Sequence, residues 1–424
     1  MRVRAVLVAS AVFASLAGAM FRVPMVLAQP PVTPVAAATP PGRLTERVLV
    51  AGDSSRAFAV YEPPPARAGG RRTPVLLVLD PRGRALDALR LFAPAAEALG
   101  WVVISSYNSA SDGAEDPNLV AVRDMLEWGQ RSLRLDMRRV YLAGMSGTAR
   151  ATWLAMADYR PYVAGLLLAA GTTPAPGAEL GLVGDPAFSV VTTTGTGDFN
   201  YEEVRRLGER LDSLKVAARV DWTDGPHGWP SEEIVTRALW WFERRAARSG
   251  RTAVDTLLLA RSLLQDVARV DSLEKAGHWD LAERLAASLA RDGSGSAAGT
   301  TLVARAAELA ARPAMRSFRD RLRRELDRER AQPLEIERAL AWERAQFDTP
   351  EADEILKRLD VPALRRSLAS PDSVASASAS RRLARVQVML AFYAPAAWER
   401  AGRPERAARL REAARAVNPA RPRS

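Results

Sequence analysis

The chain has 424 residues, of which 48% are hydrophobic and 26% are charged, a composition typical of a globular protein with one to three domains. It contains no cysteine, which excludes disulfides, thiolate metal sites and cysteine nucleophiles, and it has only two histidines. The formal net charge of +11 arises largely in residues 250–424, which hold 32 Lys and Arg against 24 Asp and Glu. Because these charges are interleaved, as in RDRLRRELDRERA, they predict a solvated helix surface, and no nucleic-acid motif accompanies them.

The N-terminus has the pattern of an export signal. A basic MRVR precedes the apolar stretch AVLVASAVFASLAGAM, and Val26 and Ala28 place small residues at the −3 and −1 positions of a cleavage site. We therefore predict a signal peptide over residues 1–28 and a periplasmic or extracellular protein. An uncleaved anchor is the alternative, although Arg22 interrupts the apolar run. The Pro-rich residues 29–42 predict a linker.

Residues 43–248 alternate short apolar runs with helix-length amphipathic segments. This alternation predicts an α/β fold with a mostly parallel sheet and helices on both faces. Two earlier runs, ERVLVAG and SRAFAVYEP, predict antiparallel edge strands. The buried parallel strands are expected within residues 73–80, 100–109, 139–144, 163–171, 188–195 and 216–222.

Ser146 follows the third of these parallel strands, in the stretch RVYLAGMSGTAR. A nucleophile elbow holds its serine on a sharp turn between strand and helix, and small neighbours permit that turn. Gly144 and Gly147 supply them, while Thr148 stands where the G-x-S-x-G pattern has its second glycine and Ala149 restores a small residue. The pattern predicts a nucleophile, with an ordinary glycine-rich turn as the alternative.

Two further polar residues follow later strands. Asp198 follows the 188–195 strand in GDFNY, and His227 follows the last strand in DGPHGWP. Ligands bind at the carboxyl ends of such strands, and the chain order Ser, Asp, His is that of α/β-hydrolases. We predict that His227 is the base that activates Ser146 and that Asp198 orients it.

Two other carboxylates compete with Asp198 for that role. They are Asp221 and Asp224, and Asp224 is expected to shape the turn before His227 instead. The second histidine, His278, lies in the polar helical segment KAGHWDLAER and is expected to be a surface or packing residue.

An oxyanion formed at the substrate carbonyl needs two backbone N–H donors. The Gly147 N–H follows the nucleophile directly, and the second donor is expected in the loop DPRGRA after the 73–80 strand. Pro81 has no N–H, so the sequence leaves Arg82 or Gly83, and we assign Arg82. An ordinary strand-to-helix loop is the alternative.

The segments LDPRGR, SSYNS, RVYLAGMSGTAR, GDFNY and GPHGWP, in this order, resemble the α/β-hydrolase superfamily. More narrowly they are similar to exported esterases of the polyhydroxybutyrate-depolymerase and feruloyl-esterase-like type, over about residues 43–248. The resemblance implies Ser146 as nucleophile, Asp198 as acid and His227 as base. Three residues that flank the site are expected either to line the substrate pocket or to pack: Asn200, Tyr201 and Trp229.

Residues 249–424 lack a strand pattern and predict an all-α, helical-repeat-like domain, with SPDSVASASAS expected as a loop. The segment WERAGRPERAARLREAARAVNP has the spacing of a tetratricopeptide hairpin, in which Gly and Ala allow close helix approach and Pro ends the second helix. A partial earlier copy keeps Gly277 and Ala282. The later residues that carry the pattern are Trp398, Gly402, Ala407, Leu410, Ala414 and Pro419. This domain is expected either to bind a protein or peptide or to pack on the hydrolase domain.

Together these features predict an exported serine hydrolase that cleaves a small or polymeric carboxylic ester through an acyl-enzyme. This chemistry needs no metal or organic cofactor, so we expect none. Two alternatives stay open. One is a catalytically silent hydrolase-like domain in an interaction protein, which Thr148 favours. The other is a serine peptidase of the same fold, which would share the triad.

Overall fold

A computed structural model describes residues 42–64, 72–111, 113, 116–175, 177–293 and 297–417. The predicted signal peptide lies outside the described residues, and so does the predicted linker except for Gly42. None of the described helices combines the length and the apolar character needed to cross a membrane. Export therefore stays a prediction.

Eight strands form one sheet in the order β1-β2-β4-β3-β5-β6-β7-β8. β1 pairs antiparallel with β2 and β2 pairs antiparallel with β4, while all later neighbours are parallel. The predicted mostly parallel sheet with two antiparallel edge strands is thus confirmed. The strands are β1 (Arg43–Val50), β2 (Asp53–Glu62), β3 (Thr73–Leu79), β4 (Val102–Ser106), β5 (Leu135–Met145), β6 (Val163–Ala169), β7 (Ser189–Gly195) and β8 (Ala217–Thr223).

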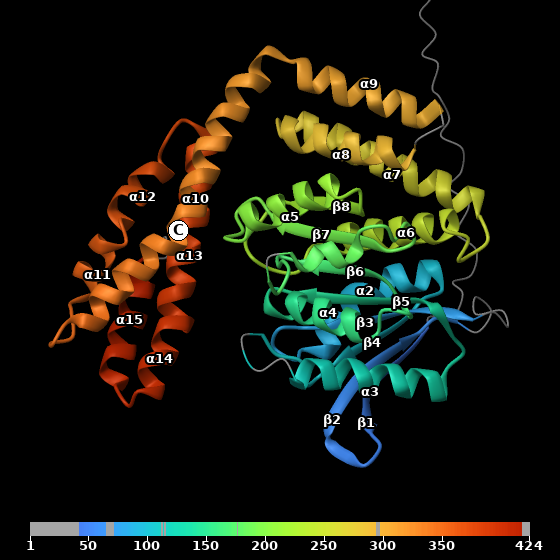
Figure 1. Cartoon of the computed structure of the whole chain (residues 1–424), viewed down its shortest axis with the longest axis horizontal. Helices are drawn as coiled ribbons and strands as arrows, with labels where there is room; N and C mark the ends of the chain where they lie inside the picture. The colour runs from blue at the N-terminus through green and yellow to red at the C-terminus, as the bar shows by residue number, and fades with distance from the viewer. Residues whose placement is uncertain are drawn as a thin grey trace, which may run out of the picture. The chain divides into compact units, whose positions relative to one another are not determined.

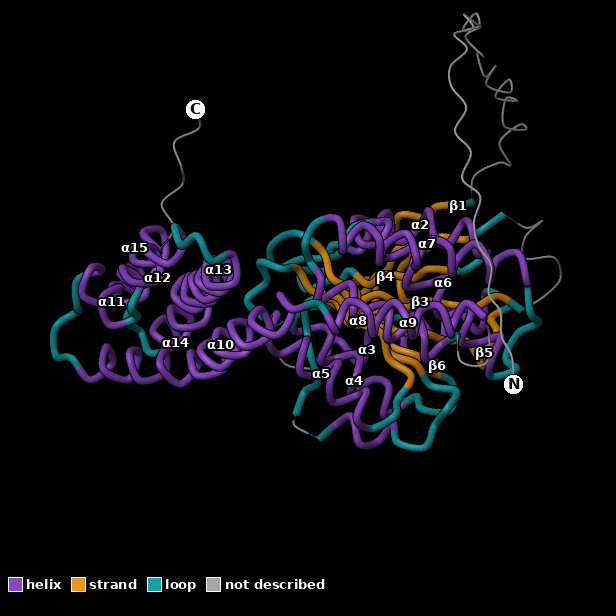
Figure 2. Tube along the Cα trace, turned by 90° about the horizontal axis from the view of Figure 1, so that it is seen from above, coloured by secondary structure: helices purple, strands orange, loops and turns teal. Residues whose placement is uncertain are grey.

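Helices cover both faces of this sheet, as Figure 2 shows with the strands in orange. Leu and Val side chains alternate between the two faces along each strand, so each face has its own apolar cluster. One cluster packs α3, α4 and α5, and the other packs α2 and α6. These helices are α2 (Ala85–Leu99), α3 (Asp116–Ser132), α4 (Gly147–Asp158), α5 (Tyr201–Ser213) and α6 (Glu232–Arg248).

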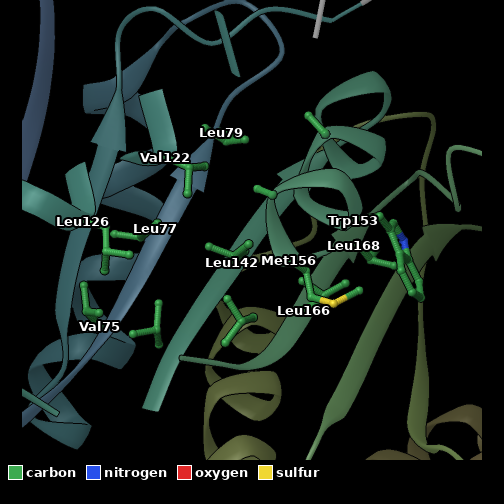
Figure 3. Packing of buried hydrophobic residues seen from close by; sticks show 14 of the residues in the cluster. Val75, Leu77, Leu79, Val122, Leu126, Leu142, Trp153, Met156, Leu166 and Leu168 are labelled. Atoms are coloured by element: carbon green, nitrogen blue, oxygen red, sulfur yellow. The ribbon is translucent and has the colours of Figure 1, made fainter. Parts of the chain in front are cut away.

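Figure 3 shows part of the first cluster, in which side chains of α3 and α4 meet those of three neighbouring strands. Full burial of such an aliphatic side chain contributes about 1.5–3 kcal/mol. The labelled side chains are Val75, Leu77, Leu79, Val122, Leu126, Leu142, Trp153, Met156, Leu166 and Leu168. This packing holds β5 rigidly at the centre of the sheet. The fold is that of the α/β-hydrolases, as predicted.

From α7 on, the described residues form helices and short turns without a strand, which confirms the predicted all-α C-terminal region (Figure 1). The helices are α7 (Thr256–Lys275), α8 (Trp279–Asp292), α9 (Ala297–Ala311), α10 (Pro313–Ala345), α11 (Ala352–Arg358), α12 (Val361–Leu368), α13 (Ser373–Val388), α14 (Ala394–Arg400) and α15 (Pro404–Val417). A π-helical turn over Met389–Tyr393 joins α13 to α14.

These helices pack into two separate apolar cores. In the first, α7, α8 and α9 pack against Tyr201 and against Trp222 of β8, so they cover the edge of the sheet. In the second, residues of α10 to α15 pack on one another. The predicted boundary between domains, at residue 249, lies between α6 and α7.

Two features of the helical region differ from the sequence-based expectation. SPDSVASASAS is not a loop, because α13 begins at Ser373 and the Asp372 carboxylate caps it by accepting the Val374 N–H at 3.0 Å. Gly277 and Gly402 do not serve close helix approach, since a Cβ on either would meet no atom within 4 Å. Both have a positive φ, of 78° and 70°, which a turn between two helices requires and glycine adopts freely.

The other residues of the predicted hairpin behave as expected where they are described. Ala282, Leu410 and Ala414 belong to the helical cores, and Ala407 is buried as well. Trp398 packs against the second core. Pro419 lies outside the described residues. A tetratricopeptide-type repeat stays a prediction.

Candidate active site

Ser146 occupies a strained turn between β5 and α4. Its φ and ψ are 56° and −126°, a backbone conformation that non-glycine residues rarely adopt and that the surrounding structure must enforce. Gly144 is needed here, because a Cβ on it would lie 2.4 Å from the Thr148 backbone oxygen. Gly171, which the sequence analysis did not single out, is needed as well: its Cβ would lie 2.5 Å from the Ser146 backbone oxygen. The geometry is that of a nucleophile elbow.

Thr148 fits this turn without a clash. It is fully buried, and its hydroxyl donates to the Leu79 backbone oxygen at 2.6 Å. The same hydroxyl accepts the Met145 N–H at 3.0 Å. The side chain that departs from the usual glycine therefore links the elbow to the end of β3.

His227 and Asp198 meet at the carboxyl ends of β7 and β8. His227 Nδ1 lies 2.9 Å from Asp198 Oδ1, and the same oxygen accepts the Asn200 N–H at 2.8 Å. Asp198 has no solvent exposure, whereas the His227 side chain is 20% exposed. A buried carboxylate on Nδ1 leaves Nε2 as the nitrogen that can exchange a proton with a substrate or a nucleophile.

The competing carboxylates lie elsewhere. Asp221 is buried among the guanidinium groups of Arg219 and Arg237. Asp224 is exposed and faces His278, whose Nε2 lies 3.7 Å from it. His278 itself is 38% exposed at the start of α8, as a surface residue would be. Asp198 is therefore the carboxylate that contacts His227.

Ser146 and His227 both reach the surface at this edge of the sheet, but among the described residues no hydrogen bond joins the Ser146 hydroxyl to the His227 ring. Catalytic hydrogen bonds in ligand-free enzymes are often long and tighten only when substrate binds. Among the described residues the structure thus contains the contact between Asp198 and His227 and no hydrogen bond from His227 to Ser146.

The two predicted oxyanion donors differ in whether their backbone N–H already has an acceptor. Gly147 is the first residue of α4, so its N–H has no intrahelical acceptor and points away from the helix. The Arg82 N–H instead donates to Asp80 Oδ1 at 2.9 Å, and the Gly83 N–H donates to the Asp80 backbone oxygen at 3.1 Å. Arg82 is therefore not placed as a free donor in this structure, because the Asp80 side chain folds back over its own loop.

Asp80 organises this loop, and the sequence analysis missed it even though it directly follows β3. Its carboxylate also accepts from the Trp229 indole N–H at 2.9 Å and from the Arg84 guanidinium at 3.2 Å. Burial alone would raise the pKa of Asp80, but these hydrogen bonds outweigh burial and lower its pKa. The Trp229 contact ties the histidine loop to the loop after β3.

The three flanking residues pack instead of lining a pocket. The Asn200 side chain donates to the Ala170 backbone oxygen at 2.8 Å, and Trp229 is held by Asp80 and by an edge-on contact with Phe92. Tyr201 is buried against Trp222, and this burial raises its pKa. Of the two alternatives for Tyr201, the structure shows packing.

A cleft of about 480 Å³ opens between α5 and the loop after β6. That loop starts at Gly171, where a Cβ would lie 2.5 Å from the Ser146 backbone oxygen. Its lining residues include Thr172, Thr173, Pro174, Glu203, Arg206 and Leu207. Within the described part of the chain, no group of three or more side chains could hold a metal ion.

Comparison with known proteins yields structural likenesses only. No family model and no curated protein sequence matches the chain. Solved structures that resemble it include a ferulic acid esterase (12% identity, 48% of this chain, 99% of that chain, TM-score 0.38). Another is Est1E from Butyrivibrio proteoclasticus (12% identity, 48% of this chain, 100% of that chain, TM-score 0.37). A third is the fluorophosphonate-binding serine hydrolase FphF from Staphylococcus aureus (12% identity, 48% of this chain, 98% of that chain, TM-score 0.38). At this level of similarity these proteins say nothing of the activity of this chain.

Proposed function

We propose that this chain is a serine hydrolase that cleaves carboxylic esters through an acyl-enzyme. The observation that carries the proposal is the buried Asp198 carboxylate on His227 Nδ1, at the same sheet edge as the strained Ser146 turn. A φ of 56° is strained for a serine, and a purely structural role does not require it. A nucleophile does require it, because the turn exposes the serine hydroxyl at its tip.

In this mechanism Ser146 Oγ attacks the ester carbonyl while His227 Nε2 takes its proton. Asp198 fixes the tautomer that presents Nε2 and stabilises the imidazolium that forms. The Gly147 N–H stabilises the negative oxygen of the tetrahedral intermediate. His227 then returns the proton to the leaving alcohol, and water repeats the sequence to release the acid and restore Ser146.

The second oxyanion donor requires a change in the loop after β3. If it is the Arg82 N–H, its hydrogen bond to Asp80 must be shared or broken when substrate binds. The cleft beside α5 offers room for the acyl or alcohol part of the ester. The proposal includes export of the protein to the periplasm or out of the cell. It also includes both small and polymeric esters as substrates.

The silent hydrolase-like domain is the second candidate, because Asp80 accepts the Arg82 N–H and, among the described residues, no hydrogen bond joins the Ser146 hydroxyl to His227. In that case the helical region would be the working part, with a protein or peptide partner. A peptidase would share the triad, and no feature of the described residues favours it over an esterase.

Labelling of the purified protein by a fluorophosphonate probe separates these candidates. We expect labelling of the wild type, and loss of labelling in Ser146→Ala and His227→Ala. Ser213→Ala is the matched control, since this serine is exposed and only caps the end of α5 through the Arg210 backbone oxygen. A folded wild type that resists the probe would overturn the proposal. If the wild type is labelled, kcat/KM of the unlabelled enzyme on short-chain aryl esters and on the matching aryl amides distinguishes ester from peptide cleavage.

A further inference from the structure

Two buried arginines of α13 contact the loop that carries Asp198, although 185 residues separate them in sequence. Arg381 Nη1 donates to the Thr196 backbone oxygen at 2.8 Å, and Arg385 Nη2 donates to the Phe199 backbone oxygen. Thr196 and Phe199 lie on either side of Asp198. The two arginines are four residues apart, so they project from the same face of the helix.

One residue of α10, Glu329, contacts both arginines. Glu329 accepts from Arg381 Nε and Nη2 at 3.0 and 2.5 Å, and its backbone oxygen accepts from Arg385 Nη1 at 2.8 Å. Glu329 is 1% exposed and Arg381 is 4% exposed. A bidentate, buried guanidinium has little freedom to move, so its remaining donors are fixed in position.

The same loop also determines the position of the imidazole. The Phe199 ring stacks on His227 with 4.2 Å between ring centroids, and the Gly197 N–H donates to the Gly225 backbone oxygen of the histidine loop at 2.9 Å. The rest of the Arg381 guanidinium lies over the Tyr201 ring, 4.3 Å from its centroid. Displacement of α13 would therefore move both Asp198 and the ring against which His227 packs.

We propose that Arg381 and Arg385 are positioning residues, which clamp the acid loop so that Asp198 meets His227 Nδ1. The C-terminal helices are then part of the active centre's support and not an independent module. The catalytic consequence of this inference rests on the proposed hydrolase function. The geometric part, in which the two arginines fix the contact between Asp198 and His227, is independent of that function.

Arginine is required at both positions because each guanidinium contacts two acceptors in different directions. Lysine keeps the charge but offers one flexible ammonium, which cannot hold Glu329 and a loop carbonyl in the same rigid geometry. Arg381→Lys and Arg385→Lys therefore loosen the clamp without leaving Glu329 unpaired. Arg406→Lys is the matched control: Arg406 is 2% exposed, pairs with Glu343 and donates to the Glu343 and Gln346 backbone oxygens, far along the chain from the acid loop.

The first readout is the proton NMR signal of the His227 Nδ1–H in the full-length protein with nitrogen-labelled histidine. Only two histidines contribute, and His278→Gln assigns them. A hydrogen bond to a buried carboxylate shifts this proton downfield and slows its exchange. We expect the signal in the wild type and in Arg406→Lys, and we expect it to broaden or vanish in Arg381→Lys and Arg385→Lys. An unchanged signal in both clamp variants would overturn the inference.

The second readout is the rate of Ser146 labelling by the fluorophosphonate probe. We expect it to fall at least tenfold in the clamp variants, up to the roughly 10²-fold that a 1 Å displacement costs, and to stay unchanged in Arg406→Lys. Melting temperatures separate positioning from general destabilisation, because Arg406→Lys should melt as low as the clamp variants. If Arg385→Lys does not fold, Glu329→Gln supplies the second test. A wild type that is not labelled would refute the hydrolase proposal alone, while the NMR signal still decides the clamp.

Discussion

The Thr148 hydroxyl donates to the backbone oxygen of Leu79 over 2.6 Å and so ties the helix after Ser146 to the end of β3. β3 leads directly into the loop that holds Asp80 and Arg82. The nucleophile elbow and the candidate oxyanion loop are thereby fixed to each other by one side chain. The threonine that breaks the G-x-S-x-G pattern thus connects α4 to β3 through its side chain.

We predict that Thr148→Val destabilises the protein. Valine has the same shape but no hydroxyl, so the Met145 N–H and the Leu79 oxygen lose a partner in a buried site. The free energy of unfolding in urea should fall by about 1–3 kcal/mol, the cost of buried polar groups left unsatisfied. Thr148→Ser keeps the hydroxyl and should lose clearly less. Equal stability of the valine and serine variants would contradict the bridging role.

Gly171→Ala should slow the reaction of Ser146 with the fluorophosphonate probe while the sheet stays intact. Its Cβ would lie 2.5 Å from the Ser146 backbone oxygen and 2.6 Å from the Ala149 Cβ, so the elbow must shift. We expect the labelling rate of Ser146 to fall by about 10²-fold, as for a displacement near 1 Å. Gly181→Ala is the control, since a Cβ there meets nothing within 4 Å. Normal labelling of Gly171→Ala would show that the turn accommodates a Cβ at this position and would contradict the prediction.

Asp198→Asn should reduce ester hydrolysis by about 10⁴-fold, because an amide can stabilise the wrong imidazole tautomer. The measurement is kcat on an aryl ester, with the fold monitored by circular dichroism. Asp224→Asn should leave kcat unchanged, because that carboxylate is 73% exposed and faces His278. Comparable losses in the two variants would reopen the assignment of the acid.

The sequence predicted the fold well because the signals are local. Continuous apolar runs mark buried parallel strands, and polar residues directly after them mark the carboxyl edge of the sheet. Asp198 and His227 could therefore be found without coordinates. Helix α13 could not, because its Ser- and Ala-rich start has little apolar periodicity, although Asp372 has the place of an N-cap.

Non-local contacts explain what the sequence left open or missed at the site. Tyr201 directly follows the acid loop in sequence, yet α7 to α9 and Arg381 bury it from the other side. The Arg82 N–H donates to the side chain of Asp80, two residues earlier. The rotamer of Asp80 cannot be predicted from the pattern of apolar and polar residues. The contact of Arg381 with Thr196 depends on how α13 lies against the loop after β7, which a linear pattern does not encode.

A buried ionic cluster attaches the first C-terminal helix to the sheet. Asp266 of α7 pairs with Arg219 of β8 and with Arg237 and Arg244 of α6, and it is 1% exposed. Asp266→Ala leaves buried cations without this partner, so the free energy of unfolding should fall by about 3–5 kcal/mol. Asp271→Ala should cost little, since Asp271 is 52% exposed and only 3.7 Å from Arg305.

The same carboxylate makes stability depend on acid. Burial opposes ionisation of Asp266, but the charges of Arg219, Arg244 and Arg237 and the hydrogen bond from Arg219 outweigh it and hold the pKa far below its usual value. Because the folded-state pKa is the lower one, the stabilisation is complete above the unfolded-state pKa of about 3.9 and is lost as the pH falls from there towards the folded-state pKa. Urea unfolding measured from neutral pH down to about pH 2.5 should therefore show a steeper acid loss in the wild type than in Asp266→Asn. Parallel pH profiles of the two proteins would mean that Asp266 contributes no linkage and that other carboxylates govern acid unfolding.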